Sequence, residues 1–195
     1  KFVATAPSGA SITAVTKEES KDPIRIYAGV QSADSIDARA DLVLQELIRT
    51  KAFERKSLLL VTTTGSGWID GKSVEPFEYM NNGNTAVVGV QYSYLPSWIS
   101  LLADQSKVKD TSSTVFTKVY DYWKTLPEDS RPNFYLYGLS LGSFGVETVL
   151  NSVELVNEPI NGALLAGPPF VNELHDSLEK KRDAGSPAYL PIVNN

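Results

Sequence analysis

Short apolar runs, separated by longer stretches with helical periodicity, constrain the fold of this chain more than any other feature. Residues 57–62, SLLLVT, are apolar at almost every position, which is typical of a strand covered on both faces of a sheet. Residues 85–93 and 162–167 have a similar character, whereas residues 32–50 place apolar side chains along one helical face. We therefore expect an α/β fold, with a mostly parallel sheet and helices on both of its faces.

The remaining elements continue this alternation along the chain. Strands are predicted at residues 23–30 and 133–140, and helices are predicted at residues 110–126, 141–156 and 171–184. The sequence contains no internal repeat and no low-complexity tract. A single domain therefore accounts for the alternating part of the chain.

The first 22 residues differ in composition from the rest. They are polar and rich in Ser, Thr and Ala, and they lack the continuous apolar core of a signal peptide. We interpret residues 1–22 as a leading segment or linker, and residues 23–195 as the α/β domain. Because the chain does not begin with Met, we expect it to be a processed or excised piece of a longer protein.

Composition argues against several classes of function. A net charge of −5 with no basic run argues against nucleic-acid binding. The absence of cysteine excludes disulfides, thiolate catalysis and Cys-ligated metals. His175 is the single histidine, and no loop pattern supports a carboxylate site, so we expect neither a metal nor a cofactor. No segment is long and apolar enough to span a bilayer.

The pentapeptide GLSLG at residues 138–142 matches the pattern Gly-x-Ser-x-Gly, and it joins a predicted strand to a predicted helix. In that setting a nucleophilic serine occupies a tight turn with strained backbone angles. Gly138 and Gly142 must then be small, because side chains there would collide with the strand and the helix. A tight turn without chemistry is the alternative. We favour Ser140 as a nucleophile, because the strand, the helix and a glycine-rich loop after residues 57–62 all accompany it.

The start of the helix after Ser140 offers groups that stabilise negative charge. Free N–H groups and the helix dipole favour an anion there. The N–H of Leu141 is therefore expected to donate to an oxyanion, the negatively charged oxygen of the reaction intermediate. A second donor is expected from the loop TTTGSGW, where Thr63, Thr64 and Gly65 are the candidates.

Five sequence segments together resemble the α/β-hydrolase superfamily: RIYAGVQSADS, TTTGSGWID, EYMNNGNTAVVGVQYSYLPSW, YLYGLSLGSFG and AGPPF. More narrowly, they are similar to an actinobacterial group of α/β-hydrolase catalytic domains, in which a membrane-spanning N-terminal region precedes the hydrolase domain. The resemblance covers most of the chain. It implies a serine hydrolase with Ser140 as nucleophile, on the extracytoplasmic side of a membrane to which the full-length protein is tethered.

A serine nucleophile needs an adjacent base, and in this fold the order along the chain is Ser, then Asp or Glu, then His. His175 follows Ser140 by only 35 residues and lies in the charged stretch NELHDSLEKK. We interpret it as a surface histidine beside Glu173 and Asp176. Catalytic roles for His175 as base, and for Asp176 or Glu173 as acid, are the alternatives. We expect Glu147 to be a structural salt-bridge partner.

The base that the resemblance implies lies on a loop after the last strand, well beyond His175. We therefore interpret the chain as the N-terminal two-thirds of an α/β-hydrolase domain. The acid and the histidine would lie in a C-terminal part that is cleaved, lost or present as a separate fragment. A nicked domain can stay folded when its pieces remain packed together.

The stretch YSYLPSWISLLAD at residues 92–104 follows a strand and is rich in apolar side chains. Because loops after parallel strands line ligand sites, Tyr94 and Trp98 can form an acyl-binding wall or lid. A helix with Trp98 in the core is the interpretation that we favour. Trp68 can shape a substrate pocket in either case.

These observations predict a serine hydrolase that acts on an ester or thioester, of a small molecule or a cell-envelope lipid, through an acyl-enzyme. An acyltransferase that passes the same acyl group to another alcohol is a close alternative. A catalytically silent domain that binds a lipid or a partner protein is the alternative from a different class, because fold does not guarantee chemistry.

Overall fold

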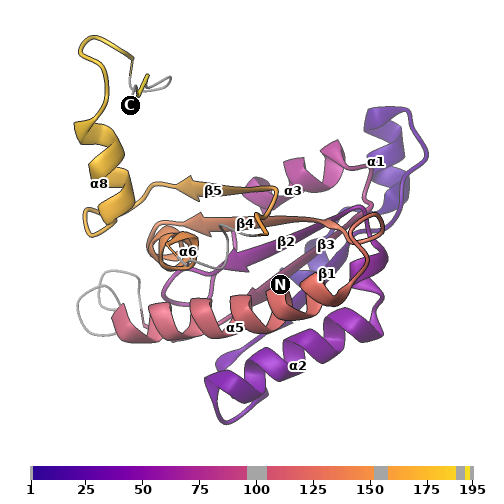
Figure 1. Ribbon diagram of the computed structural model, residues 1–195. Helices are drawn as coiled ribbons and strands as arrows, with labels where there is room; N and C mark the ends of the chain where they lie inside the picture. The colour runs from indigo at the N-terminus through magenta and orange to yellow at the C-terminus, as the bar shows by residue number, and fades with distance from the viewer. Residues whose placement is uncertain (1, 96–104, 152–157, 188–191, 194–195) are drawn as a thin grey trace.

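The computed structural model describes residues 2–95, 105–151, 158–187 and 192–193, and its centre is a five-stranded parallel sheet (Figure 1). The strands are β1 (Ile24–Ala28), β2 (Ser57–Thr62), β3 (Thr85–Val90), β4 (Asn133–Leu139) and β5 (Gly162–Ala166). They lie in the order β1-β3-β2-β4-β5, and every neighbouring pair is parallel. The carboxyl ends of all five strands therefore meet at one edge, where ligand sites of such sheets lie.

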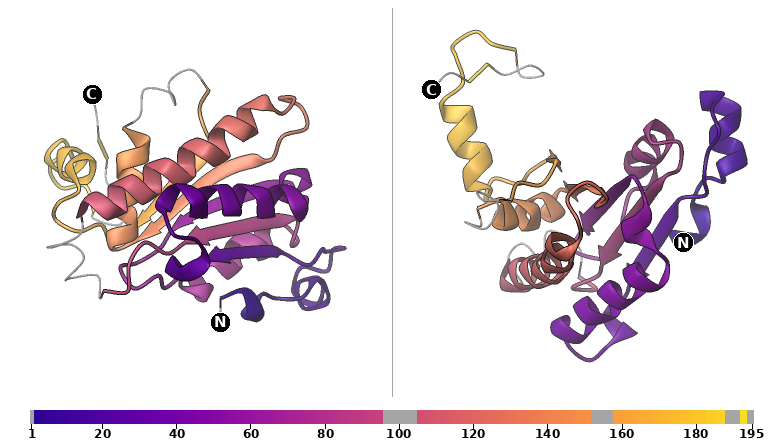
Figure 2. Two further views of the ribbon diagram at one scale, coloured as in Figure 1. Left: turned by 90° about the horizontal axis from the view of Figure 1, so that it is seen from below. Right: turned by 45° about the vertical axis from the view of Figure 1, so that its right-hand side comes forward.

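Helices cover both faces of the sheet, which confirms the predicted fold class. On one face lie α2 (Ile36–Arg49), α5 (Gln105–Thr125) and α6 (Leu141–Leu150), and on the other lies α3 (Gly71–Met80) (Figures 1 and 2). α1 (Gly9–Thr16) precedes β1, and α8 (Glu173–Lys180) follows β5. Short 3₁₀ helices occur as η1 (Val3–Thr5), η2 (Val30–Ser32) and η3 (Ala52–Glu54).

The side chains of β2 explain why its sequence is apolar throughout. Leu58 and Leu60 point into the larger core, which lies under α2 and α5. Leu59 and Val61 point to the opposite face and pack in a second core with Val74 of α3. Alternate residues of one strand are thus buried on both sides, as expected for the centre of a parallel sheet.

Helix α3 is an element that the sequence analysis did not predict. Its N-terminus is capped by Asp70, whose side chain accepts hydrogen bonds from the N–H of Lys72 (3.3 Å) and the hydroxyl of Ser73 (2.7 Å). Gly71 at its start and Pro76 inside it both disfavour helix. Burial of its inner face against the sheet outweighs these local preferences.

The leading segment is folded rather than a plain linker. It forms α1, which is capped by the hydroxyl of Ser8, and it buries Ile12 completely. The N–H of Gly9 donates to a carboxylate oxygen of Asp22 at 2.6 Å, which joins the start of α1 to the residues before β1. The domain boundary at residue 22 stays a prediction.

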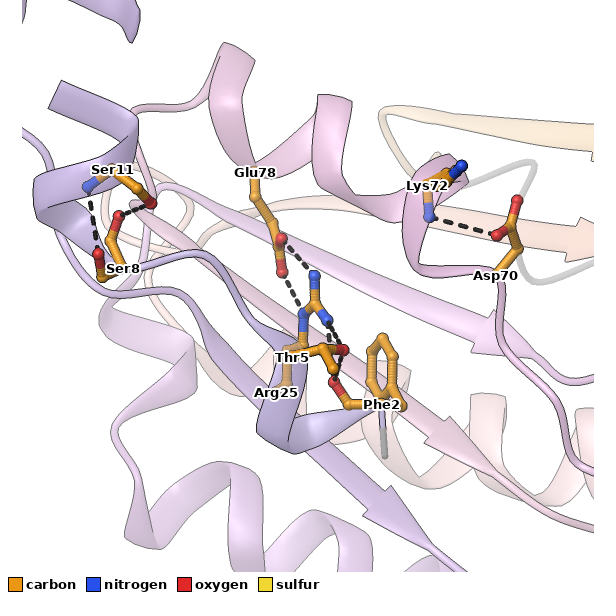
Figure 3. A network of polar contacts seen from close by, with 8 residues as sticks. All are labelled: Phe2, Thr5, Ser8, Ser11, Arg25, Asp70, Lys72 and Glu78. Carbon is orange, nitrogen blue, oxygen red and sulfur yellow. Dashed lines mark hydrogen bonds and ion pairs between the residues drawn. The ribbon is translucent and has the colours of Figure 1, made fainter. Parts of the chain in front are cut away.

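A buried ion pair between Arg25 of β1 and Glu78 of α3 fixes this segment to the sheet (Figure 3). Two hydrogen bonds of 2.7 Å join the guanidinium to both carboxylate oxygens. The same guanidinium donates to the carbonyl of Phe2 at 2.9 Å, and it lies 4.7 Å from the centre of the Phe2 ring. Burial raises the pKa of the Glu78 carboxyl, and the hydrogen bonds from Arg25 act in the opposite direction.

Removing one partner of this pair should leave a buried, uncompensated charge. We expect Arg25→Met or Glu78→Gln to lower the free energy of unfolding by about 3–5 kcal/mol, measured by urea denaturation. The double variant Arg25→Met/Glu78→Leu should lie much closer to the parent protein, since it leaves no charge unpaired. Glu46→Gln, which breaks the exposed pair with Arg49, is the control and should cost less than about 1 kcal/mol. Parental stability in both single variants would contradict this account.

Candidate active site

Ser140 lies at the turn between β4 and α6, with φ 54° and ψ −121°. A positive φ is uncommon for a residue other than glycine, and such strain clusters at functional sites. The turn is fixed by hydrogen bonds of its backbone. The N–H of Ser140 donates to the carbonyl of Ala166 at 2.8 Å, and its own carbonyl accepts from the N–H of Ser143 at 2.8 Å. The backbone angles are those that the motif predicts, and the nucleophilic role stays a prediction.

The glycines that flank Ser140 allow the backbone to approach itself closely. A Cβ atom at Gly138 would collide with the carbonyl of Gly142, and a Cβ atom at Gly142 would collide with the carbonyl of Thr62. Gly145, which the sequence analysis did not single out, plays a similar part, because a Cβ there would collide with the hydroxyl of Ser112. Only glycine fits these three positions without a shift of the neighbouring atoms.

The loop after β2 lies directly beside the start of α6. The carbonyl groups of Thr62 and Thr63 both approach Gly142, so the chain leaves β2 against the first turn of the helix. Leu141 is the first residue of that helix, and the N–H groups of a first turn have no intrahelical acceptor. The two predicted sources of oxyanion donors therefore lie next to each other at the carboxyl edge of the sheet.

The three donor candidates in this loop differ in what they already bind. The N–H of Thr64 donates to the carbonyl of Trp68 at 3.2 Å, so Thr64 is the least suitable donor in this conformation. The hydroxyl of Thr63 donates to the carbonyl of Val90 at 3.2 Å, which leaves the backbone N–H of Thr63 as a candidate. Gly65 is buried beside them and also takes part in an interaction within the protein, and it stays a predicted donor.

His175 lies on α8, beyond the carboxyl end of β5 (Figure 1). Its side chain is exposed, and it forms no hydrogen bond or ion pair with another residue of the described ranges. Asp176 pairs with Lys180 on the surface of the same helix, and Glu173 is exposed. The structure thus does not join the candidate base or either candidate acid to Ser140 by a hydrogen bond.

The prediction that Glu147 is a salt-bridge partner is wrong. Its carboxylate is buried, and no cation of the described residues pairs with it. One oxygen accepts from the side-chain amide of Asn172 at 2.8 Å, and the other accepts from the backbone N–H of Leu174 at 2.8 Å. Leu174 lies in the first turn of α8, where unpaired N–H groups and the helix dipole favour a carboxylate. Glu147 therefore ties α6 to the segment that follows β5.

Two of the three predicted pocket residues lie within the described ranges. Trp68 is 56% exposed and lines a cleft of about 500 Å³, together with Phe2, Val3 and Tyr27. Tyr94, which follows β3, is 60% exposed. Trp98 lies outside the described residues. Among the described residues Ser140 does not line this cleft, so its link to the candidate nucleophile stays a prediction.

Two other kinds of feature are absent from the part of the chain that the structure describes. Within residues 2–95, 105–151, 158–187 and 192–193, no group of three or more His, Asp or Glu side chains is arranged to bind a metal ion. In the same ranges, no helix combines the length and the apolar character that a bilayer crossing requires.

Comparison with known proteins agrees with the fold. The model of the alpha/beta-hydrolase family matches residues 24–195, and the chain therefore belongs to the α/β-hydrolase family. No curated protein and no solved structure matches the chain. Family membership supports a hydrolase-like enzyme. The narrower resemblance to the membrane-tethered actinobacterial group stays a prediction.

Filling the space at the turn should destabilise the protein. We expect Gly142→Ala to lower the free energy of unfolding by about 3 kcal/mol or more, because the added methyl group meets backbone atoms that cannot rotate away. Gly162→Ala is the matched control, since a Cβ there lies 3.5 Å from the Tyr135 ring, an ordinary contact. Urea denaturation of both variants measures the difference. Equal stability of the two would show that the turn is less tightly packed than described.

Proposed function

We propose that this protein is a serine hydrolase that cleaves an ester or thioester through an acyl-enzyme. The observation that carries the proposal is the strained backbone of Ser140, at the junction of β4 and α6 in a chain of the α/β-hydrolase family. A strained residue of this kind costs about 1–3 kcal/mol, and it persists where function or packing requires it. The turn presents the serine at a helix N-terminus, where a developing oxyanion is stabilised.

The proposed reaction has two stages. The hydroxyl oxygen of Ser140 attacks the carbonyl carbon, its proton passes to a base, and the oxyanion accepts hydrogen bonds from Leu141 N–H and from Thr63 or Gly65 N–H. The C–O or C–S bond to the leaving group then breaks, and the base returns the proton to the departing alcohol or thiol. In the second stage the base takes a proton from water as its oxygen attacks the acyl carbon. The bond to Ser140 Oγ then breaks, the base returns the proton to Oγ, and the carboxylic acid leaves.

The base is proposed to lie outside the described residues, in a C-terminal segment of the same protein. Exposure of His175 and the absence of a hydrogen bond to its side chain support this proposal, within the described ranges. The apolar surface near the edge strand is a second support. Leu164 of β5 is 60% exposed, and it lines a groove of about 590 Å³ together with Phe77 and Met80 of α3. Parallel sheets are normally covered on both faces.

The proposal also includes a substrate class and a location. A cell-envelope lipid ester, and a place on the extracytoplasmic side of a membrane, follow from the resemblance to the membrane-tethered group. A silent binding domain is the second candidate function. It is favoured by the same observation on His175, because a serine without a base is a weak nucleophile.

The test is pre-steady-state hydrolysis of p-nitrophenyl butyrate. The sample is the protein isolated from the cells that produce it, together with any C-terminal segment that stays bound to it. We expect a burst of p-nitrophenol that is stoichiometric with enzyme, followed by slower turnover. Ser140→Ala should lower the rate by a factor on the order of 10³ or more. Ser130→Ala, at an exposed serine before β4, is the control and should match the parent.

Each of the other results decides between the candidates. Parental activity in Ser140→Ala would overturn the proposal, and absence of any Ser140-dependent release of p-nitrophenol would favour the silent binding domain. Loss of activity in His175→Gln, with the fold intact, would place the base in this chain instead of outside it. Methyl butyrate formation in the presence of methanol, in preference to hydrolysis, would identify an acyltransferase.

A further inference from the structure

Gln91, the first residue after β3, connects three loops at the carboxyl edge of the sheet. Its side-chain N–H₂ donates to the carbonyl of Ser66 at 2.9 Å and to the carbonyl of Ser93 at 2.9 Å. Its side-chain oxygen accepts from the N–H of Val30 at 3.3 Å. One mostly buried amide thus joins the segments that follow β1, β2 and β3. Buried hydrogen bonds of this kind are costly to break, because the groups left behind have lost water as a partner.

Tyr27 of β1 contacts the loop after β2 at Gly67, the residue next to Ser66. Its hydroxyl donates to the carbonyl of Gly67 at 2.8 Å. Burial, with a smaller effect of the nearby Tyr94 phenol, raises the pKa of Tyr27 to about 12. The phenol therefore keeps its proton, and remains a donor, throughout the pH range in which a hydrolase works.

The packing at Gly67 shows that these contacts are close. Gly67 has φ +84°, and a Cβ atom there would collide with the hydroxyl of Tyr27 and with the side chain of Gln91. The loop also closes on itself, because the N–H of Gly67 donates to the carbonyl of Thr64 at 2.9 Å. The 63–68 loop is therefore a compact turn that packs against two side chains, those of Tyr27 on β1 and of Gln91 just after β3.

The other end of the 63–68 loop lies against the turn at Ser140. Thr62 and Thr63 approach Gly142, one residue after Leu141. A shift of the loop would change the distance between the N–H of Leu141 and the donor at Thr63 or Gly65. Misplacement of a reacting group by about 1 Å can lower a rate about 10²-fold.

We infer that Gln91 and Tyr27 are positioning residues, which hold the 63–68 loop where its backbone N–H can reach the oxyanion. The inference rests on the proposed function, because it assigns the loop to stabilisation of the oxyanion. Gln91 acts through Ser66, and Tyr27 acts through Gly67. Tyr27 lies on β1 and Gln91 directly follows β3, and both strands lie on the far side of β2 from β4, so these residues act through the loop rather than through β4.

The experiment compares Gln91→Glu and Tyr27→Phe with matched controls. Gln91→Glu keeps the shape of the side chain but replaces its donors with a carboxylate oxygen, and Tyr27→Phe removes only the hydroxyl. Gln45→Glu makes the same charge change at an exposed site on α2. Tyr135→Phe removes a phenol that forms no hydrogen bond with another described residue. If Gln91→Glu does not fold, Tyr27→Phe tests the inference by itself.

Hydrogen exchange of the loop amides, followed by mass spectrometry, is the readout that does not depend on activity. In both test variants the peptide that spans residues 63–68 should exchange at least about 10-fold faster than in the parent, while the controls match the parent. In steady-state ester hydrolysis, kcat should fall about 10-fold or more with KM changed less than about 2-fold, because the donor acts mainly in the transition state.

Parental exchange rates in both test variants would overturn the inference, and so would faster exchange with an unchanged kcat. A rise in KM with kcat preserved would also contradict it, because the loop would then act in substrate binding. If the parent protein shows no Ser140-dependent turnover, the proposed function fails, and the exchange rates alone decide whether Gln91 and Tyr27 hold the loop.

Discussion

The turn from β4 into α6 has space for backbone atoms only, and the arrangement of the candidate site depends on that constraint. A side chain at Gly138 or Gly142 would enter the volume of a neighbouring carbonyl group. The contact between Gly142 and Thr62 brings β2, β4 and α6 together at Ser140. It also places the helix N-terminus beside the loop after β2, so that a nucleophile and two sources of N–H donors share one edge of the sheet.

Polar side chains fix the helices and loops that surround the sheet, whereas apolar packing fixes the sheet itself. Arg25 and Glu78 attach the leading segment and α3 to β1, and Gln91 joins three loops. Glu147 likewise joins two elements, because its carboxylate links α6 to the start of α8. Each of these groups is buried and hydrogen bonded, so displacement of its partner would leave a polar atom without water.

The sheet and most of the helices could be predicted from the sequence, because their signals are local. The apolar run at 57–62 became β2 with the same bounds. The strand predicted at 85–93 ends at Val90, and the side chain of the next residue, Gln91, bonds to the neighbouring loops. The roles of Glu78 and Glu147 had no local signal. Their partners lie 53 and 25 residues away, and only the folded chain brings them together.

The most direct test of this account is intact-mass analysis after treatment with a fluorophosphonate, which reacts with activated serines. The account predicts one adduct per protein molecule, formed when the protein is studied with any accompanying segment, and complete loss of the adduct in Ser140→Ala. It also predicts that His175→Gln is labelled like the parent. An adduct that persists in Ser140→Ala, or a folded parent protein that forms no adduct, would contradict the claim that the strained serine is an activated nucleophile.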